Sequence, residues 1–180
     1  MPAALASMAA HRQGKFWPMH DKLFENAKAL DEVSLKKYAQ EVGLNVGKFD
    51  KDMADPTLKA QIVAQQQMSA KVGARGTPAF FINGKYLSGA QPFEAFKAKI
   101  DEELKAVDEL MKKGVPVGKV YETLMKDAKA EVAAGPPPGP PQGAPPGGEQ
   151  RALGPIPVGN SPFKGAKGAP VTIVEFSDFQ

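Results

Sequence analysis

One stretch of the chain is too rich in proline and glycine to form regular structure. Between residues 135 and 170, 20 of the 36 positions are proline or glycine. Proline has no amide hydrogen to donate to a helix or a sheet, and glycine loses the most backbone entropy when it is ordered. We therefore interpret residues 135–157 as a linker, which joins a larger body, residues 1–134, to a short segment, residues 158–180.

The body is predicted to be a series of helices followed by one hairpin. Apolar residues recur at helical spacing in five segments, which are residues 2–13, 16–24, 30–43, 46–53 and 56–72. The short apolar run Pro78–Ile82 then meets Asn83-Gly84, a strong signal for a two-residue hairpin turn. Residues 85–89 form the partner strand, and helices are expected from Pro92 and over Lys119–Ala133. Beyond the linker, Val171–Phe176 is a further strand.

The composition limits the chemistry that these residues can perform. There is no cysteine and there are only two histidines, so a disulfide, a Cys-ligated metal and a thiol nucleophile are excluded within the chain. We expect no metal site and no cofactor. The net charge of +3 is too small to indicate nucleic-acid binding. No apolar run reaches the roughly 18 residues that a membrane span needs.

Several motifs together resemble one known family. Thr77–Gly84, with its partner strand and the following helix, resembles the cis-proline loop and closing β-β-α unit of the thioredoxin fold, in its DsbA-like branch. Gly14–Phe24 and Leu35–Leu44 are similar to the helical insert of that family. Ala169–Gln180 resembles the family's opening strand, which runs directly into a Cys-Pro-X-Cys motif.

The resemblance implies an α/β, thioredoxin-like fold with a helical insertion and an incomplete sheet. Residues 1–73 would form the insert, and residues 76–134 the cis-proline hairpin and the closing helices. The opening strand would come from residues 158–180 and pair antiparallel with residues 79–83.

The order of these parts departs from the family pattern, because the opening strand follows the rear half of the domain. The dithiol motif, the first long helix and the strand after it are absent, and the first catalytic cysteine would fall one position after Gln180. The chain is then either a piece of a tandem protein or a permuted fragment. The opening strand can pair within its own chain or be exchanged with a second copy, which would give a homo-oligomer.

Three residues carry over from the family as site residues. Thr77 and Pro78 match the loop that binds substrate peptide, although Pro78 merely starting a strand is the alternative from local sequence. Glu175 matches a partly buried acid that relays protons to a thiol, where burial would favour its protonated form. The alternative for Glu175 is an edge-strand carboxylate that faces water. The catalytic cysteines have no counterpart here.

The resemblance implies a thiol–disulfide oxidoreductase that acts on reduced or unfolded proteins in the periplasm or elsewhere outside the cytoplasm. Thiol–disulfide exchange needs a thiolate, so this chain alone is expected to be inactive. One alternative is a peptide-binding thioredoxin-like module without catalysis. Another is a scaffold that recruits partners through residues 135–157.

Overall fold

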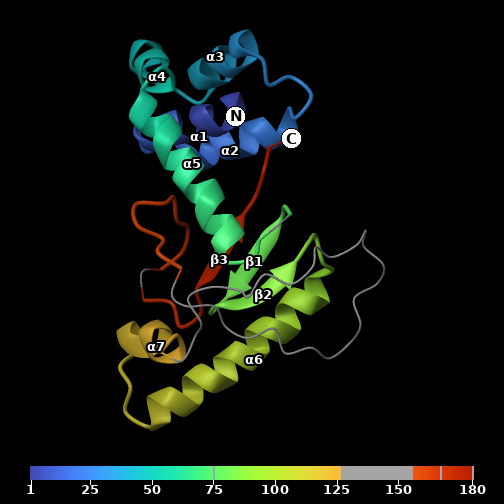
Figure 1. The fold of residues 1–180 in the computed structure, drawn as a ribbon, viewed down its shortest axis with the longest axis vertical. Helices are drawn as coiled ribbons and strands as arrows, with labels where there is room; N and C mark the ends of the chain where they lie inside the picture. The colour runs from blue at the N-terminus through green and yellow to red at the C-terminus, as the bar shows by residue number, and fades with distance from the viewer. Residues whose placement is uncertain (75, 127–155, 167, 180) are drawn as a thin grey trace. The chain divides into compact units, whose positions relative to one another are not determined.

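The computed structural model describes residues 1–74, 76–126, 156–166 and 168–179, which form two compact units (Figure 1). The helical unit comprises Met1–Met68 with Asn160–Phe163 and Asp178–Gln180. The sheet unit comprises Ser69–Gly159 with Lys164–Ser177. We describe each unit by itself. Apart from residues 156 and 157, the predicted linker lies outside the described residues.

The helical unit is built from the five predicted helices, whose existence is confirmed. They are α1 (Pro2–His11), α2 (Phe16–Glu25), α3 (Glu32–Glu41), α4 (Val46–Met53) and α5 (Pro56–Lys71), of which the last three residues belong to the sheet unit. Side-chain caps fix two of the starts: the carboxylate of Asp31 accepts from the Ser34 amide, and the side chain of Asn45 accepts from the Lys48 amide.

Small residues on α1 form the centre of the helical unit. Ala6, Ala9 and Ala10 are fully buried, so α2, α3 and α4 can approach the α1 backbone closely. The larger apolar side chains of the core surround this alanine face, and they are Met19, Leu23, Leu35, Tyr38, Phe49 and Leu58.

An ion-pair network joins the end of α1 to the connection between α4 and α5. Arg12 Nη1 donates to the carboxylates of Asp52 at 3.0 Å and Asp55 at 2.6 Å. Lys48 also donates to Asp52, at 2.6 Å. Hydrogen bonds, first from Arg12 and then from Thr57, lower the pKa of Asp55 to about 2.

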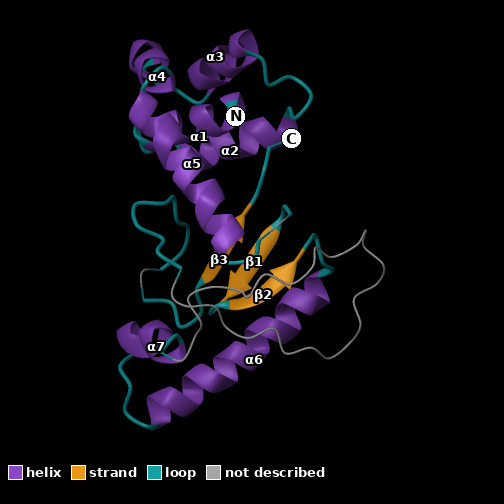
Figure 2. Cartoon of the chain, in the orientation of Figure 1, coloured by secondary structure: helices purple, strands orange, loops and turns teal. Residues whose placement is uncertain are grey.

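The sheet unit contains a three-stranded antiparallel sheet (Figure 2). Its strands are β1 (Ala79–Ile82), β2 (Lys85–Ser88) and β3 (Ile173–Phe176), in the order β2-β1-β3. The antiparallel pairing of the C-terminal strand with the strand after Pro78 is therefore confirmed, here within one chain. The hairpin turn is also confirmed, since Asn83 and Gly84 both have positive φ, as a type I′ turn requires.

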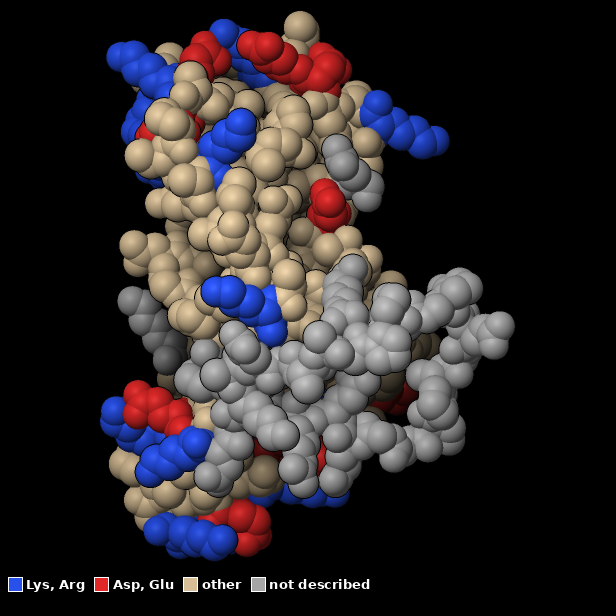
Figure 3. Space-filling view, viewed as in Figure 1, with Lys and Arg blue, Asp and Glu red and all other residues tan. Residues whose placement is uncertain are grey.

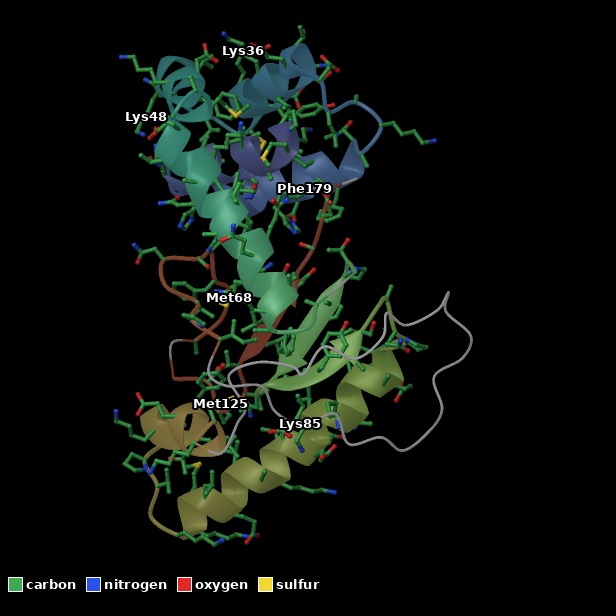
Figure 4. All side chains as sticks on the ribbon, viewed as in Figure 1. Lys36, Lys48, Met68, Lys85, Met125 and Phe179 are labelled. Atoms are coloured by element: carbon green, nitrogen blue, oxygen red, sulfur yellow. The ribbon has the colours of Figure 1, made fainter. Side chains whose placement is uncertain are left out.

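Two further helices, α6 (Phe93–Lys112) and α7 (Val117–Leu124), complete the sheet unit. Phe96 of α6 packs edge-on against Phe80, with ring centroids 4.8 Å apart. Lys85 of β2 lies between the sheet and α6 (Figure 4), and its Nζ is 2.7 Å from Oε1 of Glu103 on α6. The helix therefore supports the strand that follows the Thr77–Pro78 loop.

Two predicted boundaries in this unit were wrong. The last helix, expected over residues 119–133, starts at Val117 and ends at Leu124; residues 127–133 lie outside the described part of the chain. The predicted linker extended to residue 157, yet Ile156 is buried, and its amide donates to the hydroxyl of Tyr121 at 3.4 Å. Composition misled here because this one apolar residue docks, although its neighbours in sequence are prolines.

Candidate functional site

The loop before β1 presents an exposed backbone. The peptide bond between Thr77 and Pro78 is cis. Thr77 is exposed, and its backbone makes no hydrogen bond to another residue in the described ranges. Pro78 is half-buried, and its carbonyl accepts from the Gly89 amide at 2.9 Å. This loop thus offers an unpaired amide and carbonyl, which is the requirement for pairing with an extended peptide.

Strand β3 ends beside this loop. In the register of β1 with β3, Ala79 lies opposite Phe176 and Phe80 lies opposite Glu175. Ala79 and Phe176 are the last pair of the register. Pro78 precedes Ala79 in the chain, and Ser177 follows Phe176. The chain that leaves β3 therefore starts at the level of the Thr77–Pro78 loop.

Asn83 holds the start of β3 in place, a role that sequence analysis missed. Its amide donates to the carbonyl of Thr172 at 2.8 Å, and its Oδ1 accepts from the Thr172 amide at 2.9 Å. Asn83 is 2% exposed. Asn-Gly identified the turn, but no local signal reveals a partner 89 positions away.

Glu175 is exposed, as in the alternative of an edge-strand carboxylate that faces water, and its role as a proton relay stays a prediction. It lies on β3, the outer strand, and within the described residues no further strand pairs beyond β3. Because Thr172 bonds to β1, antiparallel alternation turns the backbone groups of Ile173 and Glu175 toward the open edge. Ile173 is 46% exposed on the same face of the sheet.

The described ranges hold neither a cluster of possible metal ligands nor a helix of membrane-spanning length and hydropathy. They contain no cluster of three or more histidines and acidic residues that could hold a metal ion. No helix among them is both long and apolar enough to cross a bilayer. On the face shown in Figure 3, basic and acidic side chains are interspersed over the helical unit and again around α6 and α7.

The curated relatives match only part of the chain. A Na(+)/H(+) antiporter NhaA from Herminiimonas arsenicoxydans is 39% identical over 88 residues, which are 49% of this chain and 14% of that protein. The Na(+)/H(+) antiporter NhaA 3 from Salinispora tropica is 34% identical over 98 residues, which are 54% of this chain and 15% of that protein. The chain thus spans about a seventh of the length of these relatives. No solved structure matches the chain.

A family match covers more of the chain. Residues 2–101 match the DSBA-like thioredoxin domain, and they include helices α1 to α5, the Thr77–Pro78 loop and the hairpin. The absence of cysteine agrees with the missing dithiol motif. Because this match covers more than half of the chain, the chain belongs to the DSBA-like thioredoxin domain family.

Proposed function

We propose that this chain is part of a thiol–disulfide oxidoreductase that acts on reduced or unfolded proteins outside the cytoplasm. The chain would supply the substrate-binding loop at Thr77 and Pro78 and the opening strand β3. The catalytic dithiol would come from residues outside these 180. The observation that carries the proposal is the register of β1 with β3, which ends beside Pro78.

The register supports the proposal because of where it brings the chain after β3. In the family, the dithiol motif follows the opening strand. The chain leading from β3 to a dithiol would thus start beside the loop that presents the unpaired Thr77 backbone. A substrate strand bound there would have its own sulfur close to the attacking thiolate.

The chemistry would be a two-step exchange. A thiolate of the enzyme attacks one sulfur of a disulfide, and the other sulfur leaves as a thiolate and takes up a proton. The second enzyme thiol then attacks the mixed disulfide, releases the reduced substrate and leaves the enzyme oxidised. With a reduced protein as substrate the same steps run in reverse: a substrate thiolate attacks the enzyme disulfide, the substrate gains the disulfide and the enzyme is left reduced. We propose Glu175 as the acid that moves protons at this site once a further strand or helix covers the open edge of β3.

The test restores the missing thiols. We expect the 180-residue chain to show no insulin reduction with dithiothreitol, and the chain lengthened after Gln180 by a natural continuation carrying Cys-Pro-X-Cys to reduce insulin. The matched control carries Ser-Pro-X-Ser in the same continuation. Thr77→Pro in the active version removes the loop amide that would pair with substrate, and should raise KM.

Failure of the lengthened chain, with its fold intact by circular dichroism, would reject the oxidoreductase proposal. The alternative, a peptide-binding module without catalysis, then predicts that the chain still binds reduced, unfolded protein and loses this binding with Thr77→Pro. The scaffold alternative predicts instead that deletion of residues 135–157 abolishes binding while the fold remains.

A further inference from the structure

Two side chains of the helical unit hold a segment from far along the sequence. Nε2 of His11, at the end of α1, is 2.8 Å from the backbone carbonyl of Asn160. Nε1 of Trp17, on α2, donates to the backbone carbonyl of Phe163 at 3.0 Å. A carbonyl only accepts, so the first contact places a proton on Nε2 of His11. His11 and Trp17 therefore bind two backbone carbonyls that are three residues apart.

Asn160 ends a turn, and the spacing of the two carbonyls fits a polyproline II conformation in the residues that follow it. Such a helix has three residues per turn, so carbonyls at positions i and i+3 point to the same side. Pro162 fixes its own φ near the polyproline II value and favours an extended Ser161 before it. Residues 161–164 form neither helix, strand nor turn. Ser161 and Pro162 are half-buried, whereas Asn160 and Phe163 are exposed, so the Ser-Pro pair is the better covered part of the segment.

The two donors belong to a row of aromatic rings. Phe16 stacks edge-on against Trp17, with centroids 5.1 Å apart, and against His11 at 6.1 Å. The row continues through His20 to Phe179, which comes from the far end of the chain and lies beside the end of α2 (labelled in Figure 4). Aromatic rings beside an indole N–H are what modules that recognise proline-rich peptides present to their ligands.

We propose that His11, Phe16 and Trp17 form a binding site for extended, proline-containing peptides, and that residues 160–163 occupy this site from within the chain. Both of these hydrogen bonds are made to backbone carbonyls, so an external peptide with the sequence Asn-Ser-Pro-Phe can make the same contacts. Proline fits because it brings no amide that would need a partner. The site requires no thiol and is independent of the Thr77–Pro78 loop.

The internal segment competes with any external peptide, because it is tethered at an effective concentration in the millimolar range. The test therefore uses the full chain with this segment weakened. Pro162→Gly removes the restriction that keeps the segment extended. A fluorescein-labelled peptide of residues 158–165, followed by anisotropy, should bind this variant at least about threefold more tightly than it binds the unaltered chain.

Removal of one donor tests the site itself. In the Pro162→Gly background, Trp17→Phe keeps an aromatic ring but loses the N–H, and should weaken peptide binding about fivefold. His11→Phe should act in the same direction and serves as a second variant. The matched control, Tyr38→Phe, removes a hydroxyl that donates to the Ala29 carbonyl elsewhere in the unit, and should leave the affinity unchanged.

Two results would overturn the proposal. One is the absence of saturable binding to the Pro162→Gly variant at millimolar peptide. The other is equal affinity for the Trp17→Phe and Tyr38→Phe variants, provided that circular dichroism shows both to be folded. A peptide in which glycine replaces its proline should bind several-fold more weakly, and equal binding would refute the polyproline II geometry.

Discussion

Replacement of Lys85 by methionine should lower the free energy of unfolding, because Lys85 links the sheet to α6. Glu103 is 1% exposed and faces Lys85 at 2.7 Å. Burial lowers the pKa of Lys85, but its hydrogen bond to Glu102 and its ion pair with Glu103 outweigh this and leave the pKa raised. Lys85→Met keeps the apolar stem and leaves the Glu103 carboxylate buried without a cation.

Breaking a buried pair from one side costs about 3–5 kcal/mol. We expect the lower end, about 3 kcal/mol, because the Lys85 side chain is 34% exposed and water screens the pair in part. Lys85→Met combined with Glu103→Leu removes both charges and should recover most of the loss. The control, Lys99→Met, removes an ion pair to the exposed Glu102 and should cost under about 1 kcal/mol.

Urea unfolding at pH 7 measures the unaltered chain, these three variants and the single variant Glu103→Leu. The reasoning is refuted if Lys85→Met costs no more than Lys99→Met, or if the double variant is as unstable as the sum of its single changes. Either result would mean that Glu103 has access to water or to another cation.

Three further predictions concern single contacts. Asn83→Gly keeps the turn but loses the side-chain bond to Thr172; it should cost about 1–2 kcal/mol and raise deuterium exchange in β3 more than in β2. Arg12 holds the pKa of Asp55 at about 2, below its unfolded value. The contribution of ionised Asp55 to the stability of the fold is therefore complete above about pH 4 and is lost as pH falls toward 2. Asp55→Asn should therefore flatten the acid side of the stability profile, and an unchanged profile would contradict this. Ala6→Leu should cost about 1–3 kcal/mol in thermal unfolding, since Ala6 is fully buried.

Sequence patterns predicted most of the elements because the local signals were strong. The apolar period of 3.6 marked α2 and α3, and Asn83-Gly84 marked the hairpin, since few other residue pairs adopt positive φ twice. The pairing of β3 with β1 came from the family resemblance, because no local pattern specifies a partner strand about 90 residues away.

The site was predicted less completely, for physical reasons. Burial of Glu175 depends on what covers the edge of β3, and no residue near it in sequence determines this. The bonds from His11 and Trp17 to residues 160–163 are made to backbone carbonyls, which every residue has, so sequence carries no signal for them. The sequence therefore indicates no binding role for Trp17 or His11.

The central structural claim is that β3 pairs with β1 of its own chain in the observed register, and introduced cysteines test it directly because the chain has none of its own. Ile82 and Ile173 face each other as a non-hydrogen-bonded pair, for which a Cα separation of about 4.5 Å allows a disulfide. Leu87 lies two strands away from Ile173 and two residues further along the sheet, at about 12 Å, beyond disulfide reach.

We predict that oxidation of the variant Ile82→Cys/Ile173→Cys gives a disulfide within one chain, seen as a monomer with altered mobility on a non-reducing gel. The control Leu87→Cys/Ile173→Cys should stay reduced under the same conditions. Disulfide-linked dimers would show that β3 is exchanged between copies. Absence of any disulfide in the Ile82→Cys/Ile173→Cys variant would contradict the register, and with it the placement of the chain after β3 beside the Thr77–Pro78 loop.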